Sequence, residues 1–346
     1  MKTILKLFTL LLLVSFAFSC SKNDDDEPEP VIDVYVVGLE NNTTSSSIAK
    51  SWKNGIESPL TSGISYASAN SVFVYENDIY IAGRENENSH SVAKYWKNGI
   101  PNSLTSPIGF TSASLNSIYI DNGDVYACGQ ETNNSGIYVA KYWKNGIETS
   151  LTNGVEKAYA QDIKVIDSNI YVVGRAMIDG YMIACLWLNG ILTELTDGNY
   201  FASAMSVFIE DNNVYVTGFE ESATNDIAKI WKNGVAIPLS TNESYAECVK
   251  VVNGNIYSVG WEYVNGKNIA TLWTNGIANY LTDSTKNAVA ESLFVLDNDV
   301  YVTGYEENNN GDTGVIKVWK NGQVLELTNG LIDSYAYDIF VTKKLK

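Results

Sequence analysis

The segment Asp78-Ile79-Tyr80-Ile81-Ala82-Gly83, followed by Val92-Ala93-Lys94-Tyr95-Trp96-Lys97-Asn98-Gly99, is one instance of a pattern that occurs seven times in the chain. In each instance a Tyr-x-x-Gly segment precedes a Trp, and that Trp stands two residues before an Asn-Gly pair. Self-similarity at a period of 42 to 47 residues is typical of repeat folds, and four short strands per repeat indicate a β-propeller. The seven tryptophans are Trp52, Trp96, Trp143, Trp187, Trp231, Trp273 and Trp319.

Each repeat is predicted to contain four antiparallel strands, here called A to D. In the second repeat, residues 69–74 alternate as strand A and residues 78–83 as strand B. A polar segment, 84–91, predicts a loop before strand C at 92–96. The Asn-Gly pair then fits a type I′ turn, whose two central residues need positive φ, and a short strand D follows at 100–105.

The two ends of the repeat array predict that the chain closes into a ring. The first unit starts at strand B, Asp33 to Val37, and has no strand A before it. The last segment, Tyr335 to Val341, is a strand A with no strand B after it. These pieces complete one blade if they pair, which also covers exposed strand edges. The predicted fold is all-β: a seven-bladed β-propeller over residues 33–346, in which the C-terminal strand joins the three N-terminal strands.

The N-terminal segment has the features of an export signal. Lys2 and Lys6 flank the start of an apolar run, 7–18, which is too short to span a bilayer. The run ends in Ala17-Phe18-Ser19-Cys20, which resembles a bacterial lipobox. This resemblance implies a signal peptide over 1–19, acylation of Cys20, an acidic flexible tether over 20–32, and anchoring at the outer membrane, on the surface of a Gram-negative bacterium. Simple secretion is the alternative.

The repeat also resembles a known class of propeller. Its order of Tyr-x-x-Gly, loop, Ala-x-x-Trp-x-Asn-Gly, Leu-Thr and Ala-x-Ser-Ile is similar to bacterial extracellular HAF-type repeats, and more loosely to kelch repeats. The double glycine of kelch repeats is missing. The resemblance implies the propeller fold and a platform for binding, and no single activity.

Composition limits the classes of partner. The 346 residues carry a formal net charge of −17, which repels phosphate backbones and argues against nucleic acid as a partner. Membrane contact is expected through the lipid anchor alone. Apart from Cys20, the cysteines fall in predicted strands of different repeats, where we expect small buried side chains rather than a disulfide framework. They are Cys128, Cys185 and Cys248.

Two charged positions recur together. A Glu stands two residues after the strand-B glycine in six repeats, and a Lys stands near the start of strand C in five. The repeat around 174–190 lacks both, which favours an ion pair across the B–C hairpin over an acidic ring for a ligand. As an exposed pair, each is expected to contribute about 0–1 kcal/mol.

One position of strand A predicts a ring of small polar side chains on the central channel. The residue before the buried aliphatic residue is expected to lie near one channel mouth. Asp162 and Asp338 are the carboxylates of this ring, and they are candidates for binding a cation or water. Hydrogen bonds to neighbouring backbone or to channel water are the alternative. The ring is Ser71, Ser117, Asp162, Ser206, Cys248, Ser292 and Asp338.

The residue after the strand-B glycine varies most between repeats. In three consecutive repeats it is aromatic: Phe219, Trp261 and Tyr305. Loop residues that depart from a repeat pattern are candidates for function. Together with Glu262 and Tyr263, these aromatic residues are predicted to cluster on one face and to bind a carbohydrate or a protein ligand. Covering the ends of their blades is the alternative.

Catalytic and cofactor motifs are missing from the sequence. His90 is the sole histidine, so a histidine metal cluster is excluded, and we find no phosphate-binding glycine loop. We therefore predict no metal, no cofactor and no enzymatic activity, and interpret the chain as a non-catalytic surface lipoprotein that binds glycan or peptide. The alternatives are a scaffolding subunit of an outer-membrane complex and a carboxylate-dependent glycan hydrolase.

Overall fold

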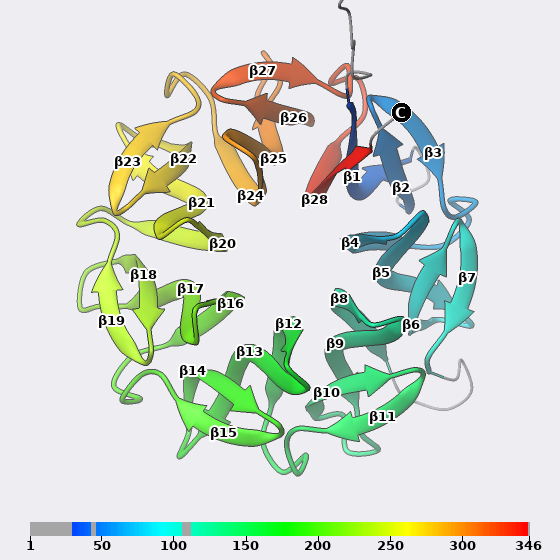
Figure 1. Cartoon of the computed structure of the whole chain (residues 1–346), viewed down its shortest axis with the longest axis vertical. Coiled ribbons are helices and arrows are strands. Elements are labelled where there is room, and N and C mark those ends of the chain that lie inside the picture. The colour runs from blue at the N-terminus through cyan, green and yellow to red at the C-terminus, as the bar shows by residue number, and fades with distance from the viewer. Residues whose placement is uncertain (1–29, 43–45, 106–111, 345–346) are drawn as a thin grey trace, which may run out of the picture.

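The computed structural model describes residues 30–42, 46–105 and 112–344. The predicted signal peptide, 1–19, and the predicted acylation site, Cys20, lie outside these ranges. Within them, 28 strands form seven four-stranded antiparallel sheets arranged as blades around a central channel (Figure 1). This confirms the predicted seven-bladed β-propeller. Across the described ranges, we find no helix that is both long enough and apolar enough to cross a bilayer.

Blade 1 is built from both ends of the described chain. It contains β28 (Ser334–Lys344), β1 (Val31–Asn41), β2 (Ser47–Lys53) and β3 (Ile56–Pro59), in that order from the channel outwards. β28 lies beside β1 and pairs with it antiparallel (Figure 1). Ile339 lies opposite Val36 in this pairing. The predicted closure of the ring by the C-terminal strand is therefore confirmed.

The other six blades follow in chain order, each with its first strand innermost. Blade 2 contains β4 (Ala67–Tyr75), β5 (Asp78–Glu87), β6 (His90–Lys97) and β7 (Ile100–Ser103), and blade 3 contains β8 (Ala113–Asp121), β9 (Asp124–Thr132), β10 (Tyr138–Lys144) and β11 (Ile147–Ser150). Blade 4 contains β12 (Ala158–Ile166), β13 (Asn169–Ile178), β14 (Tyr181–Leu188) and β15 (Ile191–Glu194), and blade 5 contains β16 (Ala202–Glu210), β17 (Asn213–Glu221), β18 (Asp226–Lys232) and β19 (Val235–Pro238). Blade 6 contains β20 (Ser244–Val252), β21 (Asn255–Val264), β22 (Lys267–Thr274) and β23 (Ile277–Tyr280), and blade 7 contains β24 (Ala288–Leu296), β25 (Asp299–Glu307), β26 (Gly314–Lys320) and β27 (Gln323–Glu326).

The repeated Trp and Asn-Gly residues hold the blades together and shape their turns. Each of the seven tryptophans is buried, and Trp96 of blade 2 belongs to one cluster with Val37 and Ala49 of blade 1. At the turn after it, Asn98 and Gly99 have φ of 51° and 80°, as a type I′ turn requires. The Asn98 side chain also accepts a 2.9 Å hydrogen bond from the backbone N–H of Ile79, which ties the turn to the start of β5.

The strand-B glycine shapes the channel. At Gly83, an added Cβ would lie 2.0 Å from the carbonyl oxygen of Ser68 on the neighbouring strand A. This close approach accompanies a β-bulge in β4, where the pairing register shifts between Ala69 and Ser71. The same shift occurs in every blade. The glycine therefore permits one extra residue in each strand that lines the channel.

The predicted ion pairs across the B–C hairpin are confirmed. Lys94 Nζ lies 2.7 Å from Glu85, and equivalent pairs form in blades 1, 3, 5 and 7. The lysines are less exposed than expected, with 6% of the Lys94 side chain accessible. The small stabilisation expected of an exposed ion pair therefore does not apply. In blade 6, where Lys is replaced by Thr271, the unpaired Glu262 accepts a 2.8 Å hydrogen bond from the Tyr280 hydroxyl.

The three described cysteines are buried and form no disulfide, in agreement with the prediction of small packing residues. Burial raises the pKa of the Cys185 thiol to about 12, so it stays protonated near neutral pH. Cys248 differs from the other two because it lines the channel.

Candidate functional site

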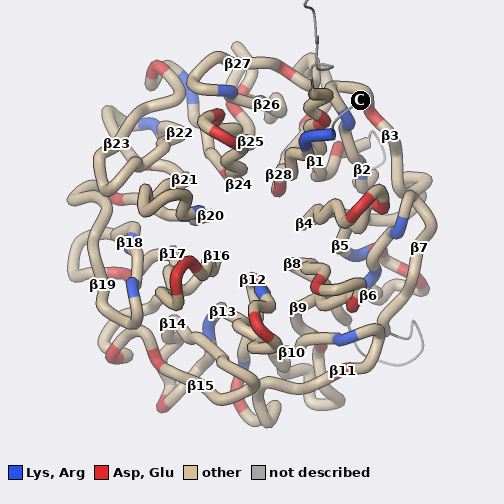
Figure 2. The backbone as a smooth tube through the Cα atoms, viewed as in Figure 1, with Lys and Arg blue, Asp and Glu red and all other residues tan. Residues whose placement is uncertain are grey.

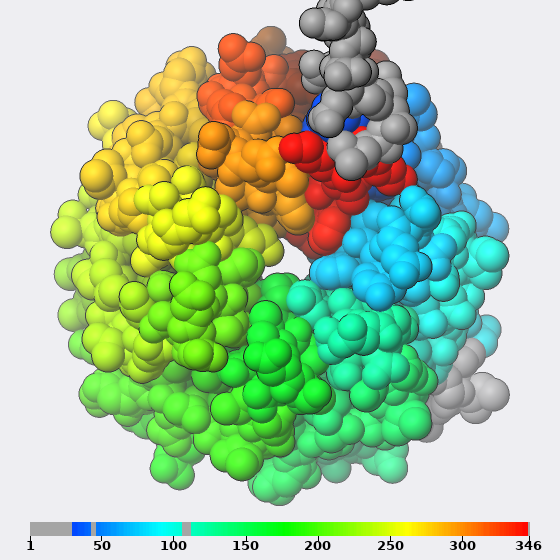
Figure 3. All heavy atoms as spheres, in the orientation of Figure 1, coloured from blue at the N-terminus to red at the C-terminus, as the bar shows by residue number. Residues whose placement is uncertain are grey.

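The central channel contains a cavity with a volume of about 390 Å³. Its wall is formed by the innermost strands β4, β8, β12, β16, β20, β24 and β28, and Figure 3 shows the opening between them. Because each strand has a bulge, three of its residues face the channel. The cavity is therefore lined by three stacked rings of side chains, called here the bulge ring, the middle ring and the collar.

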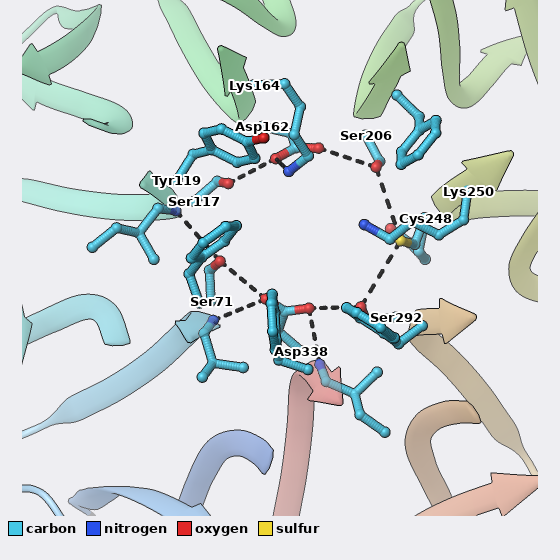
Figure 4. A pocket seen from close by; sticks show the side chains of 18 of the residues that line it. Ser71, Ser117, Tyr119, Asp162, Lys164, Ser206, Cys248, Lys250, Ser292 and Asp338 are labelled. Carbon is cyan, nitrogen blue, oxygen red and sulfur yellow. Dashed lines mark hydrogen bonds and ion pairs between the residues drawn. The ribbon is translucent and has the colours of Figure 1, made fainter. Parts of the chain in front are cut away.

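The middle ring is the predicted set of Ser, Asp and Cys residues, and its members bind one another (Figure 4). Asp162 accepts hydrogen bonds from the hydroxyls of Ser117, at 2.7 Å, and Ser206, at 3.1 Å. Asp338 accepts in the same way from Ser292, at 2.6 Å, and from Ser71, at 3.0 Å. Each carboxylate thus connects its own blade to both neighbouring blades.

Backbone groups and one lysine complete the environment of Asp162. Its carboxylate also accepts from the backbone N–H groups of Ile163, at 2.8 Å, and Val207, at 3.0 Å, and from Lys164 Nζ, at 3.1 Å. Burial alone would raise the pKa of Asp162, but Lys164 and the hydrogen bonds hold that pKa below its usual value. Both aspartates lie between two further rings rather than at a channel mouth, and their hydrogen bonds are those of the structural alternative.

The collar lies on the side of the A–B turns, two residues beyond the middle ring. Five of its seven members are aromatic, and neighbouring rings such as Phe73 and Tyr119 are in contact, with centroids 4.9 Å apart. The other two are Lys164 and Lys250, and Figure 2 shows basic positions on β12 and β20 at the inner edge of the ring. The collar is Phe73, Tyr119, Lys164, Phe208, Lys250, Phe294 and Phe340.

The two collar lysines differ in their partners. Lys164 is paired with Asp162, whose charge raises the pKa of Lys164 although burial opposes that change. The Lys250 ammonium lies over the Phe208 ring, 5.6 Å from its centroid. Among the described residues, no carboxylate forms an ion pair with Lys250. Its ammonium therefore faces the cavity without an ion pair from this part of the chain, although its charge helps to lower the pKa of Asp162 (Figure 4).

The bulge ring lies on the opposite side of the middle ring and contains two glutamates on adjacent blades, Glu247 and Glu291. Burial raises the pKa of Glu247 to about 7. Burial, together with the charge of Glu247, raises the pKa of Glu291 well above its usual value. Neither carboxylate forms an ion pair or a hydrogen bond with another described residue. The bulge ring is Asn70, Asn116, Gln161, Met205, Glu247, Glu291 and Tyr337.

The sequence did not identify the bulge ring, because strict alternation along strand A assigns these residues to the interior of the blade. The available signal was the strand-B glycine opposite them, since a glycine within a strand often marks a bulge. The sequence therefore did not predict the bulge ring, whose glutamates lack partners among the described residues. It did predict the middle ring, whose side chains form hydrogen bonds with one another.

The predicted aromatic residues lie in paired strands rather than in loops, because the B–C hairpins continue beyond the glycine. Phe219 is buried, and its ring centroid is 3.9 Å from that of Tyr245, which in turn stacks on Trp261 at 4.7 Å. Tyr305 instead packs edge-on against Tyr335, at 4.8 Å. The structure therefore connects Phe219 and Trp261 through Tyr245 and places Tyr305 in a separate contact.

The residues beside Trp261 have different environments. Glu262 is 4% exposed and holds the Tyr280 hydroxyl, whereas Tyr263 is 46% exposed. Neither residue lines the channel cavity. A ligand role for these two residues and for the three aromatic residues stays a prediction.

The described part of the chain shows no site for metal binding or for histidine-based chemistry. No group of three or more His, Cys, Asp or Glu side chains there has an arrangement that could hold a metal ion. His90, the first residue of β6, is not among the residues that line the channel.

Comparisons with known proteins support the fold. The structure is similar to the acylaminoacyl peptidase of Pyrococcus horikoshii, with a TM-score of 0.52 and 14% identity over 87% of this chain and 52% of that chain. It is also similar to a puromycin-hydrolysing peptidase of Mycobacterium tuberculosis, with a TM-score of 0.54 and 11% identity over 88% of this chain and 52% of that chain. This chain thus spans about half the length of these two peptidases. No protein-family model matches the sequence, and the search of curated proteins found no match.

A third similar structure is the β-propeller domain of the trilobed protease from Pyrococcus furiosus, with a TM-score of 0.54 and 10% identity over 88% of this chain and 97% of that domain. That domain is described as having an open velcro topology. Blade 1 of this chain is instead closed by the pairing of β28 with β1. At these identities the likeness establishes the propeller fold alone.

These comparisons correct two predictions. The sequence was interpreted as a non-catalytic module that binds glycan or peptide, with a scaffold or a carboxylate glycan hydrolase as alternatives, and as no enzyme. The similar structures reported above are instead two peptidases and the propeller domain of a protease. Repeat patterns misled here because they report how blades pack, and a propeller with the same packing serves in proteins that cleave peptides.

Proposed function

We propose that this protein has a peptidase-related function, in which the propeller receives short peptides in its central channel for hydrolysis. The observation that carries the proposal is the channel cavity of about 390 Å³, in which two carboxylates of one ring and an ammonium of another form no ion pair with the described residues. Free peptides carry both charges at their ends. The similar structures support the same direction, since each is a peptidase or the propeller domain of a protease.

The charges of the channel also favour peptide over carbohydrate, the two ligand classes that the sequence leaves open. Neutral sugars are usually held by exposed aromatic faces and amides, whereas the collar aromatics are in contact with one another. The net charge of −17 still argues against nucleic acid.

Peptide hydrolysis tests this proposal. Tripeptides are supplied to the purified protein and to envelope membranes from cells with the gene intact, deleted or restored, and free amino acids are measured by mass spectrometry. We expect hydrolysis by the purified protein, or hydrolysis by membranes that falls on deletion and returns on restoration. Equal hydrolysis in all membranes, with none by the purified protein, would overturn the proposal.

We further propose that the protein is a lipoprotein anchored through acylated Cys20 at the outer-membrane surface, and that its repeats are of the HAF-type or kelch-like kind. The Ala17-Phe18-Ser19-Cys20 segment and the repeat pattern support this proposal. Labelling with radioactive palmitate should mark the wild-type protein, and the Cys20→Ser variant should take up no label. A labelled Cys20→Ser variant would contradict the anchor.

A further inference from the structure

We propose that the channel binds a tripeptide by both charged ends, with its α-ammonium group at Glu247 and Glu291 and its α-carboxylate at Lys250. The inference rests on the proposed peptidase-related function and specifies the length and end chemistry of the peptide. It is carried by three observations: Glu247, Glu291 and Lys250 form no ion pair with a described residue, Glu247 and Lys250 lie on one strand, and the wall beside Lys250 is apolar.

The ammonium end is defined by Glu247 of β20 and Glu291 of β24. These strands belong to adjacent blades, and both carboxylates line the same part of the channel. Two neighbouring carboxylates repel each other, and no lysine or arginine of the described chain pairs with either. An ammonium group placed between them would relieve the repulsion and donate hydrogen bonds to both carboxylates.

The carboxylate end is defined by Lys250. The neighbouring Lys164 forms an ion pair with Asp162, at 3.1 Å, whereas Lys250 forms no ion pair with a described residue; its ammonium lies over Phe208, and its charge helps to lower the pKa of Asp162. In a protein with a net charge of −17, an inward-facing ammonium without a carboxylate is unusual. It can bind a carboxylate that arrives with a ligand.

The spacing of the two ends sets the length of the peptide. Glu247 and Lys250 lie on the same strand, three residues apart. A strand advances about 3.3 Å per residue, but Glu247 is the extra residue of the bulge, so these positions are separated by roughly 8 Å along the channel. An extended tripeptide spans about 10 Å between its ends, which is close to this separation.

The rings between and beside the two ends add selectivity. The middle-ring hydroxyls of Ser117, Ser206 and Ser292 donate to the aspartates, so they do not compete for the carboxylate of the peptide. Around Lys250 the collar presents aromatic rings such as Phe208 and Phe294. An aromatic or aliphatic side chain on the last residue of the peptide would therefore bury apolar surface there.

Arg84 is the competing anchor for the carboxylate. It lines the cavity at the end where Glu247 and Glu291 lie, and its guanidinium lies over the Tyr66 ring, 4.9 Å from the centroid. If Arg84 held the carboxylate, the peptide would lie across that mouth rather than along the channel. The variants below separate these two arrangements.

The test measures binding of the tripeptide Ala-Ala-Phe by isothermal titration calorimetry near neutral pH. Three ligands are compared: the free peptide, its N-acetyl form and its C-terminal amide. With the wild-type protein we expect each cap to weaken binding about tenfold to hundredfold, as expected for the loss of a charge-assisted contact. Glu247→Gln/Glu291→Gln should abolish the effect of the acetyl cap, and Lys250→Met should abolish the effect of the amide cap.

The control variant is Lys232→Met, because Lys232 carries the same charge but lies over Tyr215, outside the channel lining. It should bind all three ligands as the wild type does. Thermal unfolding confirms that each variant folds. No binding, equal binding of free and capped peptides, or an amide effect that persists in Lys250→Met and disappears in Arg84→Gln would overturn the inference.

The outcomes of this test are independent of the hydrolysis test. Gene-dependent hydrolysis without discrimination between capped and free peptides would reject the two-ended site and leave the peptidase-related function in place. Discrimination without any hydrolysis would reject the function and leave the binding site.

Discussion

Replacing Glu247 with Gln should make the protein more stable at neutral and alkaline pH, although it removes a charged residue. The pKa of Glu247 is raised from 4.5 to about 7 by burial, so the folded state holds a proton that the unfolded state has already released. Stability of the wild type should therefore fall as pH rises from about 4.5 to about 7, and level off above that value. A rise in pKa of this size corresponds to a change in the free energy of unfolding of roughly 3 kcal/mol.

The assay is urea unfolding across this pH range, followed by tryptophan fluorescence, for the wild type, Glu247→Gln and the control Glu156→Gln. Glu156 is an exposed residue before β12. We expect Glu247→Gln to match the wild type near pH 4.5 and to exceed it by roughly 3 kcal/mol near pH 8, with relief of Glu291 acting in the same direction. Glu156→Gln should follow the wild type throughout. If the curves for the wild type and Glu247→Gln run parallel, the reasoning about desolvated carboxylates without an ion-pair partner is wrong.

Four further predictions concern the framework of the ring. Asp162→Asn should lower the free energy of unfolding by about 3–5 kcal/mol at neutral pH, because the new amide nitrogen would face hydrogen-bond donors. Since the pKa of Asp162 is lowered in the folded state, this loss should shrink as pH falls below about 4. Urea unfolding at several pH values measures it. Gly218→Ala should cost about 3 kcal/mol or more in the same assay, because the new Cβ would lie 1.9 Å from the Ser203 carbonyl oxygen. A double-mutant cycle of Glu131→Gln and Lys141→Met should show a coupling of about 1–2 kcal/mol, above that of an exposed pair, and additive losses would argue against it. Deletion of residues 334–344 should expose the edge of β1 and produce aggregates in size-exclusion chromatography, whereas a stable monomer would contradict the closure.

The fold could be predicted because every blade repeats the same short sequence pattern. Asn98 and Gly99 specify their turn through positive φ, and Trp96 specifies the packing between blades, so seven copies average out local ambiguity. The repeats begin with a strand B and end with a strand A, and this offset then predicted the closure of the ring. The B–C connection was less predictable, because its polar residues, such as Asn86 and Glu87, belong to paired strands rather than to a loop.

The candidate site was only partly predictable. Asp162 and Asp338 were found from alternation along strand A, but their hydrogen bonds to neighbouring blades are a property of the closed ring. Glu247 and Glu291 were missed, since a bulge breaks the alternation that the prediction uses. Function was not predictable from the repeats, which are dominated by packing residues such as Trp273.

Because blade 1 is built from β1 and β28, it can be completed only when synthesis of the chain has reached β28. About 300 residues separate the two strands, so at roughly 5–20 residues per second the ribosome needs about 15–60 seconds to supply the partner of β1. During that interval the hydrogen-bonding edge of β1 has no partner from its own chain, while later blades have already emerged. The nascent protein should therefore depend on chaperones most strongly before translation ends, and slower translation should lengthen its exposure to aggregation.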